Sequence, residues 1–149
     1  MILLHSEDDT RVLAGRLAEL LPPGTIMLLR GPLGAGKTTL VRYLARALGF
    51  EGRVTSPTYT LMHTYPTPQG NLLHVDVYRL PEPASIYELG FEEAREDARL
   101  TAVEWGSPAD FPGALEAALE PREDGVRQVR LIGHAPELDE LAHRIAASL

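Results

Sequence analysis

The sequence predicts an α/β fold in which helices cover both faces of a mostly parallel β-sheet. Three observations support this fold class. Residues 25–29 and 100–105 are short, continuous apolar runs, the pattern of strands buried on both faces. Residues 38–49 have helical apolar spacing and end at a glycine, as helices often do. Residues 71–78 predict one further strand, and no domain boundary is visible within residues 1–149.

The remaining elements of the first half follow from local signals. A helix is expected to begin at Ser6, since Ser6 and Asp9 form an S-x-x-D cap before apolar residues at helical spacing. Residues 22–24, Pro-Pro-Gly, end that helix. Residues 56–65 are mixed and are expected to be part loop and part strand. Residues 66–70 can then form a hairpin turn into the strand at 71–78.

The second half contains one conflict of signals. Residues 83–98 are expected to be helical with a break at Gly90, and residues 106–113 form a Pro/Gly-rich connection. Residues 114–132 have helix propensity in ALEAALE, but their apolar residues also alternate on both sides of an Asp-Gly turn pair. We favour an antiparallel hairpin there. A last amphipathic helix is expected from Pro136.

Composition excludes several classes of function. The net charge is −7 and no block of basic residues occurs, so the chain is a poor candidate for binding tRNA or DNA by itself. The absence of cysteine excludes disulfides, thiolate zinc sites and a cysteine nucleophile. No apolar run reaches the roughly 18 residues of a membrane span, and the first ten residues do not resemble a secretory signal. A cytoplasmic protein is expected.

The stretch GPLGAGKTT, residues 31–39, has the form G-x-x-x-x-G-K-[ST]. It stands between the predicted strand at 25–29 and the predicted helix, which is the context that a phosphate-binding loop requires. Lys37 is expected to bridge the β- and γ-phosphates of a nucleotide, and the Thr38 hydroxyl can coordinate Mg²⁺. Lys37 is also the only lysine among 14 Lys and Arg residues. A compact ammonium is therefore kept at the one place where it fits between phosphates.

Two carboxylates end apolar runs and are candidates for holding Mg²⁺ or ordering the attacking water, Asp76 and Glu104. Either could instead be an ordinary strand-end carboxylate. His74 shares a strand face with Asp76, but without a third ligand a packed or hydrogen-bonded histidine fits better than a metal pair. Trp105 fits the core or a wall of the site. The hydroxyl-rich residues 56–59 fit a switch loop that senses phosphate or an ordinary turn equally well.

Five stretches together resemble the TsaE (YjeE) family, P-loop ATPases of the tRNA N6-threonylcarbamoyladenosine (t6A) pathway. The combination is specific, although a phosphate loop alone would not be. The stretches follow one another across most of the chain: GPLGAGKTTLVR (31–42), SPTYTL (56–61), HVDVYRL (74–80), ELGFEE (88–93) and VEW (103–105).

The resemblance implies a P-loop NTPase-like three-layer fold with antiparallel edge strands, and it implies Mg²⁺ with ATP or ADP as cofactors. Metal ligands are then expected at Thr38 and Glu104, and catalytic roles at Lys37, Asp76 and Glu104. The first helix entry would lie near the base, and Arg127 of the late hairpin would approach it. The implied nucleotide-binding residues are Ser6, Glu7, Gly31, Leu33, Gly34, Ala35, Gly36, Lys37, Thr38, Thr39, Thr58 and Arg127.

The resemblance also implies protein partners. Family members work with TsaB and TsaD, so this chain is expected to be a weak ATPase alone, stimulated by that complex, and to meet tRNA only indirectly. Pro32 departs from the acidic or polar residue usual in the family at that loop position. The alternatives are a small-molecule or nucleotide kinase and a conformational switch with little catalysis. Kinases of this type usually carry an Arg-bearing lid, and residues 80–130 contain no Arg-rich insertion. Arg79 is a doubtful arginine finger if the strand continues through residue 78.

Overall fold

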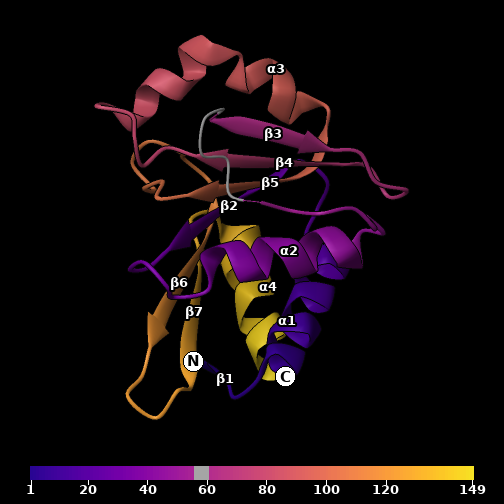
Figure 1. Ribbon diagram of the computed structural model, residues 1–149, viewed down its shortest axis with the longest axis vertical. Coiled ribbons are helices and arrows are strands. Elements are labelled where there is room, and N and C mark those ends of the chain that lie inside the picture. The colour runs from indigo at the N-terminus through magenta and orange to yellow at the C-terminus, as the bar shows by residue number, and fades with distance from the viewer. Residues whose placement is uncertain (56–60) are drawn as a thin grey trace.

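The computed structural model describes residues 1–55 and 61–149 (Figure 1). The described residues form one sheet of seven strands in the order β1-β7-β6-β2-β5-β4-β3. The strands are β1 (Ile2–Leu4), β2 (Thr25–Arg30), β3 (Met62–Tyr65), β4 (Asn71–Asp76), β5 (Ala98–Glu104), β6 (Leu115–Pro121) and β7 (Arg127–Gly133). The helices are α1 (Glu7–Leu20), α2 (Lys37–Ala47), α3 (Phe91–Glu96) and α4 (Pro136–Ala147), with a 3-10 helix η1 (Pro83–Leu89).

The centre of the sheet is parallel and its edges are antiparallel. Strand β2 pairs in parallel with both β5 and β6, and β5 pairs in parallel with β4. Strand β3 closes one edge antiparallel to β4, while β7 and β1 form antiparallel ladders at the other. This confirms the predicted fold class. The carboxyl ends of the parallel strands consequently meet at one edge of the sheet, where α/β proteins place their ligands.

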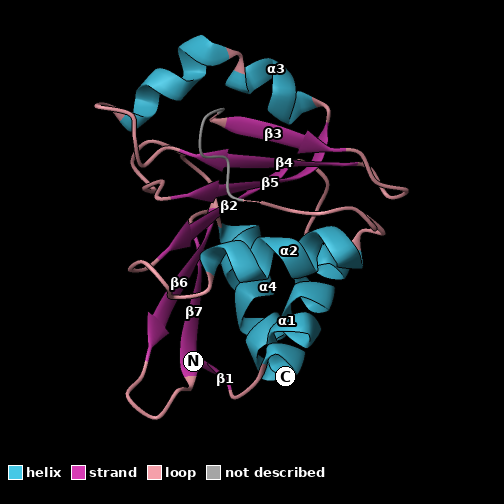
Figure 2. Ribbon diagram, viewed as in Figure 1, coloured by secondary structure: helices cyan, strands magenta, loops and turns pink. Residues whose placement is uncertain are grey.

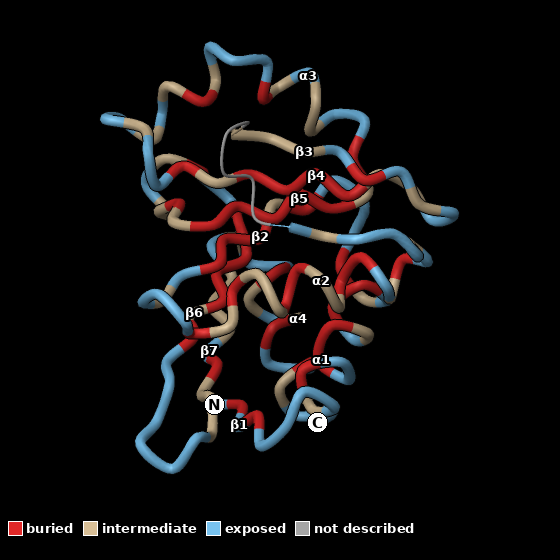
Figure 3. Tube along the Cα trace, viewed as in Figure 1, coloured by how far each residue is buried: buried red, intermediate tan, exposed pale blue. Residues whose placement is uncertain are grey.

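Helices cover both faces of the sheet, which gives three layers (Figure 2). Helices α1, α2 and α4 gather on one face, whereas η1 and α3 lie beyond β3 and β4 on the other. Each face has its own apolar core. Leu17 and Leu44 are fully buried in the first core, and Phe91 and Phe111 are fully buried in the second. Figure 3 shows the buried chain running through the central strands between these layers.

Most predicted elements are confirmed. Residues 114–132 form the hairpin of β6 and β7, and residues 66–70 connect the antiparallel pair of β3 and β4. Ser6 is the N-cap of α1, where its side chain accepts a hydrogen bond from the Asp9 N–H, while Asp9 accepts one from the His5 N–H. The closing helix begins at Pro136 as expected.

Two predicted boundaries were wrong, and one strand was missed. Strand β4 ends at Asp76 instead of residue 78, because its ladder with β5 ends at the pair Asp76 and Glu104. Ala98 belongs to β5 and not to the helical stretch, which breaks at Gly90, where φ is 88°. Strand β1 was not predicted, since three residues carry too little pattern to identify a strand.

No helix among the described residues is both long enough and apolar enough to span a membrane.

Candidate functional site

The loop between β2 and α2 depends on its glycines. Gly31, Gly34 and Gly36 have φ angles of 148°, 80° and 102°, a region that favours glycine. A Cβ atom on Gly31 would lie 2.3 Å from the carbonyl oxygen of Leu119. The chain therefore turns tightly from β2, and α2 begins directly after Gly36 with its N-terminus facing the loop. This geometry directs backbone N–H groups and positive helix potential to one point.

Lys37 is held inside this loop. Its Nζ donates hydrogen bonds to the carbonyl oxygens of Gly31, at 2.6 Å, and Pro32, at 3.1 Å. The same ammonium lies 3.7 Å from the centroid of the Trp105 ring, and only 5% of Lys37 is exposed. Burial lowers the pKa of Lys37, while Glu104 and Asp76 oppose that shift. The ammonium is therefore positioned by the loop backbone and by one aromatic wall.

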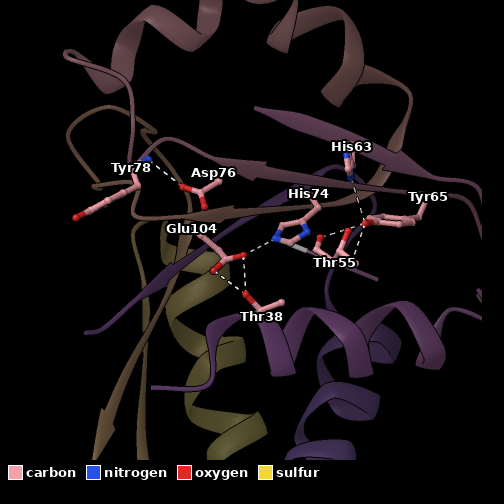
Figure 4. Close-up of polar contacts among 8 residues, drawn as sticks. All are labelled: Thr38, Thr55, His63, Tyr65, His74, Asp76, Tyr78 and Glu104. Atoms are coloured by element: carbon pink, nitrogen blue, oxygen red, sulfur yellow. Dashed lines mark hydrogen bonds and ion pairs between the residues drawn. The ribbon is translucent and has the colours of Figure 1, made fainter. Parts of the chain in front are cut away.

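Thr38, Glu104 and His74 form a chain of polar contacts (Figure 4). The Thr38 hydroxyl lies 3.2 and 3.3 Å from the two carboxylate oxygens of Glu104. Glu104 Oε2 in turn lies 2.5 Å from Nε2 of His74, which is completely buried on β4. The histidine therefore orients a buried carboxylate. The expectation of a hydrogen-bonded histidine is confirmed, and the described residues contain no group of three His, Cys, Asp or Glu that could bind a metal.

Asp76 stands beside Glu104, since the two residues are Cα partners at the ends of β4 and β5. Its Oδ1 accepts a hydrogen bond of 2.9 Å from the Tyr78 N–H, which fixes the side chain. Partial burial raises the pKa of Asp76, and the negative charge of Glu104 raises it further. Two neighbouring carboxylates thus differ in environment: Glu104 is buried against His74, and Asp76 is less buried.

One cavity of about 390 Å³ collects most of the predicted residues. The lining from the phosphate loop and α2 is Leu33, Gly34, Gly36, Lys37, Thr38 and Thr39. The lining from the rest of the chain is Leu61, Asp76, Tyr78, Arg79, Glu104, Trp105 and Arg127. Of the predicted loop residues, Ala35 instead packs its side chain in the core, and Gly31 contributes its carbonyl to Lys37.

Ser6 and Glu7 lie in a smaller cavity of about 210 Å³, and Arg127 lines both cavities. Ser6 Oγ is engaged in capping α1, while the Glu7 carboxylate accepts a hydrogen bond of 2.9 Å from the Tyr43 hydroxyl. Arg127 also packs against the loop, because a Cβ on Gly36 would lie 3.0 Å from its guanidinium. The structure thus brings the first helix entry and the late hairpin to the same side of the phosphate loop.

Part of the lining of the larger cavity was not predicted from the sequence. Arg79 was doubted because β4 was expected to continue to residue 78, but the strand ends at Asp76 and Arg79 lines the cavity. The centroid of the Tyr78 ring lies 4.8 Å from that of Trp105, with the two ring planes tilted by 43°. The φ of 69° at Trp105 turns this residue out of β5. Trp105 is therefore a wall of the site. The sequence DVYR could have indicated that these residues line the cavity, since residues directly after a strand-end carboxylate lie at the same edge of the sheet as that carboxylate.

Thr58 and the hydroxyl-rich segment 56–59 lie outside the described residues. The residue before this segment is anchored, because the Tyr65 hydroxyl contacts both the N–H and the carbonyl oxygen of Thr55, at 3.4 and 3.3 Å.

The burial of Asp76 leads to a prediction about stability. A raised pKa means that the folded state disfavours the ionised carboxyl, so stability is lost as pH rises above the unfolded value of about 3.9. Asp76→Asn keeps an acceptor for the Tyr78 N–H but removes this cost. We expect a higher melting temperature than wild type at pH 7 and a smaller difference at pH 3. Thermal melts should show no such trend for Asp97→Asn at an exposed site. A lower melting temperature of Asp76→Asn at pH 7 would contradict the argument.

Comparisons with known proteins identify the family of this chain. The family model described as "Threonylcarbamoyl adenosine biosynthesis protein TsaE" matches residues 4–129. The chain is 38% identical over 141 residues to a TsaE protein of Rickettsia felis, covering 92% of this chain and 82% of the relative. It is 39% identical over 132 residues to TsaE of Aquifex aeolicus, covering 87% and 93%. The crystal structure of Bacillus subtilis YdiB superposes with a TM-score of 0.81 at 25% identity, over 99% of this chain and 93% of that one.

The family model matches most of the chain, and relatives of that family are more than one third identical to it over most of their length. The chain belongs to the TsaE family of threonylcarbamoyl adenosine biosynthesis proteins.

Proposed function

We propose that this chain binds Mg-ATP in the cavity between the phosphate loop and the ends of β4 and β5, and that it hydrolyses ATP slowly unless TsaB and TsaD are bound. This hydrolysis would serve t6A modification at position 37 of tRNA, with tRNA held by the partners. The observation that carries the proposal is the contact of Thr38 with Glu104 beside the loop-bound ammonium of Lys37. An ammonium, a hydroxyl and a carboxylate thus line one cavity, the groups that Mg-ATP sites use.

The donor set fits Mg²⁺. A hydroxyl and a carboxylate are the hard oxygen ligands that this ion prefers, and Mg²⁺ usually takes only one or two protein ligands together with phosphates and water. Thr38 and Glu104 would hold the ion, and His74 would keep the Glu104 carboxylate turned toward Thr38. When bound, the metal supplies charge that neutralises the β- and γ-phosphates.

The cationic residues of the cavity support an anionic ligand. Arg79 and Arg127 have no ion pair or hydrogen bond with any described side chain, although the chain has 21 Asp and Glu residues. Among the described residues, the Lys37 ammonium donates hydrogen bonds only to carbonyl oxygens of the loop. An anion that enters the cavity would therefore meet three cations that no carboxylate neutralises by direct contact.

Asp76 is the candidate for ordering the attacking water. Its Oδ1 is used by the Tyr78 N–H, which leaves the other oxygen as an acceptor, and the side chain lines the cavity next to Glu104. Transfer of a proton to Asp76 would be assisted by its raised pKa. Arg79 and Arg127, which both line the cavity, would stabilise charge on the leaving phosphates.

Partner dependence can be tested by steady-state phosphate release. We expect slow release by the chain alone and at least about 10-fold faster release with a purified TsaB–TsaD pair, since an arginine finger completed by partner binding can contribute 10³–10⁵ in rate. Lys37→Ala serves as the blank. Parallel reactions with nucleosides and small alcohols detect phosphate transfer. Fast turnover that the pair leaves unchanged, or transfer to an acceptor, would favour the kinase alternative instead.

A further inference from the structure

A second groove lies away from the nucleotide cavity and shares no lining residue with it or with the smaller cavity beside it. It is bounded by α1, α2, the turn between β3 and β4, and the first residues of β5, and its volume is about 650 Å³. Small residues form its floor, Gly15 and Ala18 from α1 and Ala47 from α2. A volume of this size accommodates a small-molecule ligand.

The charge of this groove is opposite to that of the chain. Arg11, Arg46 and Arg99 line it from three different elements, and Glu19 is its only acidic lining residue, whereas the whole chain carries −7. Arg11 is already paired with Asp8, but this contact is highly exposed and contributes little. Arg46 has no carboxylate partner in the described parts of the chain; it lies 5.6 Å from the ring of Tyr43. The groove is therefore a local positive site on an acidic protein.

Arg99, which lines the groove, has one buried donor without an acceptor in the described part of the chain. Its Nη2 donates a hydrogen bond of 3.0 Å to the carbonyl oxygen of Ala18, in the last turn of α1. Its Nη1 is buried and has no acceptor among residues 1–55 and 61–149. A buried guanidinium N–H without an acceptor is costly, and an oxyanion is the acceptor that matches the planar fork of arginine.

Two carbonyl oxygens near the ends of α1 and α2, which would repel an anion in the groove, are covered by hydrogen-bond donors. The Ala18 carbonyl is covered by Arg99, and the Ala47 carbonyl accepts a hydrogen bond of 3.3 Å from the side chain of Gln69. Both groups that cover these carbonyls also line the groove. These two carbonyl oxygens are therefore already occupied by donors, which reduces their repulsion of an anion in the groove.

Gly15 is a second, independent observation. It lies in the interior of α1, where glycine is the least favourable residue after proline. No heavy atom lies within 4 Å of the position that its Cβ would occupy, so packing within the protein does not require glycine there. The absence of a side chain instead keeps the floor of the groove open.

We propose that this groove binds a small phosphorylated ligand. Three arginines against a single carboxylate suit a dianion better than a monoanion, and among the residues that the structure describes the guanidinium of Arg99 beside the groove still lacks one acceptor. The ligand would lie against the second half of α2, the helix whose first turn carries Lys37 and Thr38. This inference does not depend on the proposed ATPase activity.

The test is a titration followed by amide NMR, which shows where each ligand binds. Inorganic phosphate is the probe, and succinate is the dicarboxylate of similar charge. The Lys37→Ala background weakens binding at the phosphate loop, whose Gly34 and Gly36 amides report on any remaining binding there. We expect phosphate to shift the amides of Gly15 and Tyr43, and succinate to bind more weakly.

Two variants and one control make the result specific. Arg46→Gln is expected to weaken phosphate binding about 10-fold. Gly15→Leu should abolish it by filling the groove while the melting temperature does not fall, because leucine is the better helix former. Arg130→Gln removes an equally exposed arginine from β7 and should change nothing. Shifts confined to the phosphate loop, equal losses in both arginine variants, or binding of succinate as tight as that of phosphate would each overturn the proposal.

Discussion

Replacing Lys37 with alanine is expected to weaken ATP and ADP binding about 10- to 100-fold and to remove measurable hydrolysis. A hydrogen bond to a charged group contributes roughly 1.5–3 kcal/mol, and the Lys37 ammonium is buried, so water does not screen its contact with phosphate. The loop should keep its fold, since its positive φ angles occur at the glycines at 31, 34 and 36, which the substitution leaves unchanged. Calorimetry with Mg-ATP and Mg-ADP measures the loss of affinity.

Lys37→Arg is the matched variant, because it keeps the positive charge. The guanidinium is larger and planar, and the space between the carbonyl groups of Gly31 and Pro32 and the ring of Trp105 holds a compact ammonium. We expect this variant to be impaired as well, which would explain why the only lysine of the chain stands here. Unchanged nucleotide affinity in Lys37→Ala would refute the assignment of the site.

The fold was predictable where burial or turn chemistry leaves a pattern in the sequence. Strands β2 and β5 are mostly apolar and buried because helices cover both of their faces, and the Asp-Gly pair at 124–125 identifies the hairpin of β6 and β7. Strand β1 left no such pattern, since it is short and is defined by its pairing with β7. The end of β4 could not be predicted from the local sequence either, because the pairing of β4 with β5 determines it.

The candidate site also has one part that could be predicted from the sequence and one part that could not. The phosphate loop is contiguous in sequence, so its spacing identified Lys37 and Thr38. The contact of His74 with Glu104 joins two strands, and it depends on a pairing in which His74 lies opposite Ala102, two residues before Glu104. No sequence spacing contains that information. The place of Arg79 at the cavity was missed for a related reason, since it follows from where β4 ends.

Replacing Glu104 with glutamine is expected to raise the Mg²⁺ concentration needed for half-maximal ATP binding about 10- to 100-fold. Glutamine keeps the length of the side chain and an oxygen that can still contact Thr38 and His74, so the fold around it should survive. It removes the negative charge, which is what a buried carboxylate offers to a divalent cation. Nucleotide titrations at several Mg²⁺ concentrations measure the shift.

Asp76→Asn is the natural comparison, since Asp76 is the Cα partner of Glu104 on the neighbouring strand and lines the same cavity. Thr38 contacts Glu104 directly, whereas the described contact of Asp76 is with the Tyr78 N–H. Asp76→Asn should therefore slow hydrolysis and leave the Mg²⁺ dependence of binding nearly unchanged. If only Asp76→Asn shifts that dependence, the two carboxylates have exchanged roles: Asp76 holds the metal, and Glu104, kept in place by His74, orders the water.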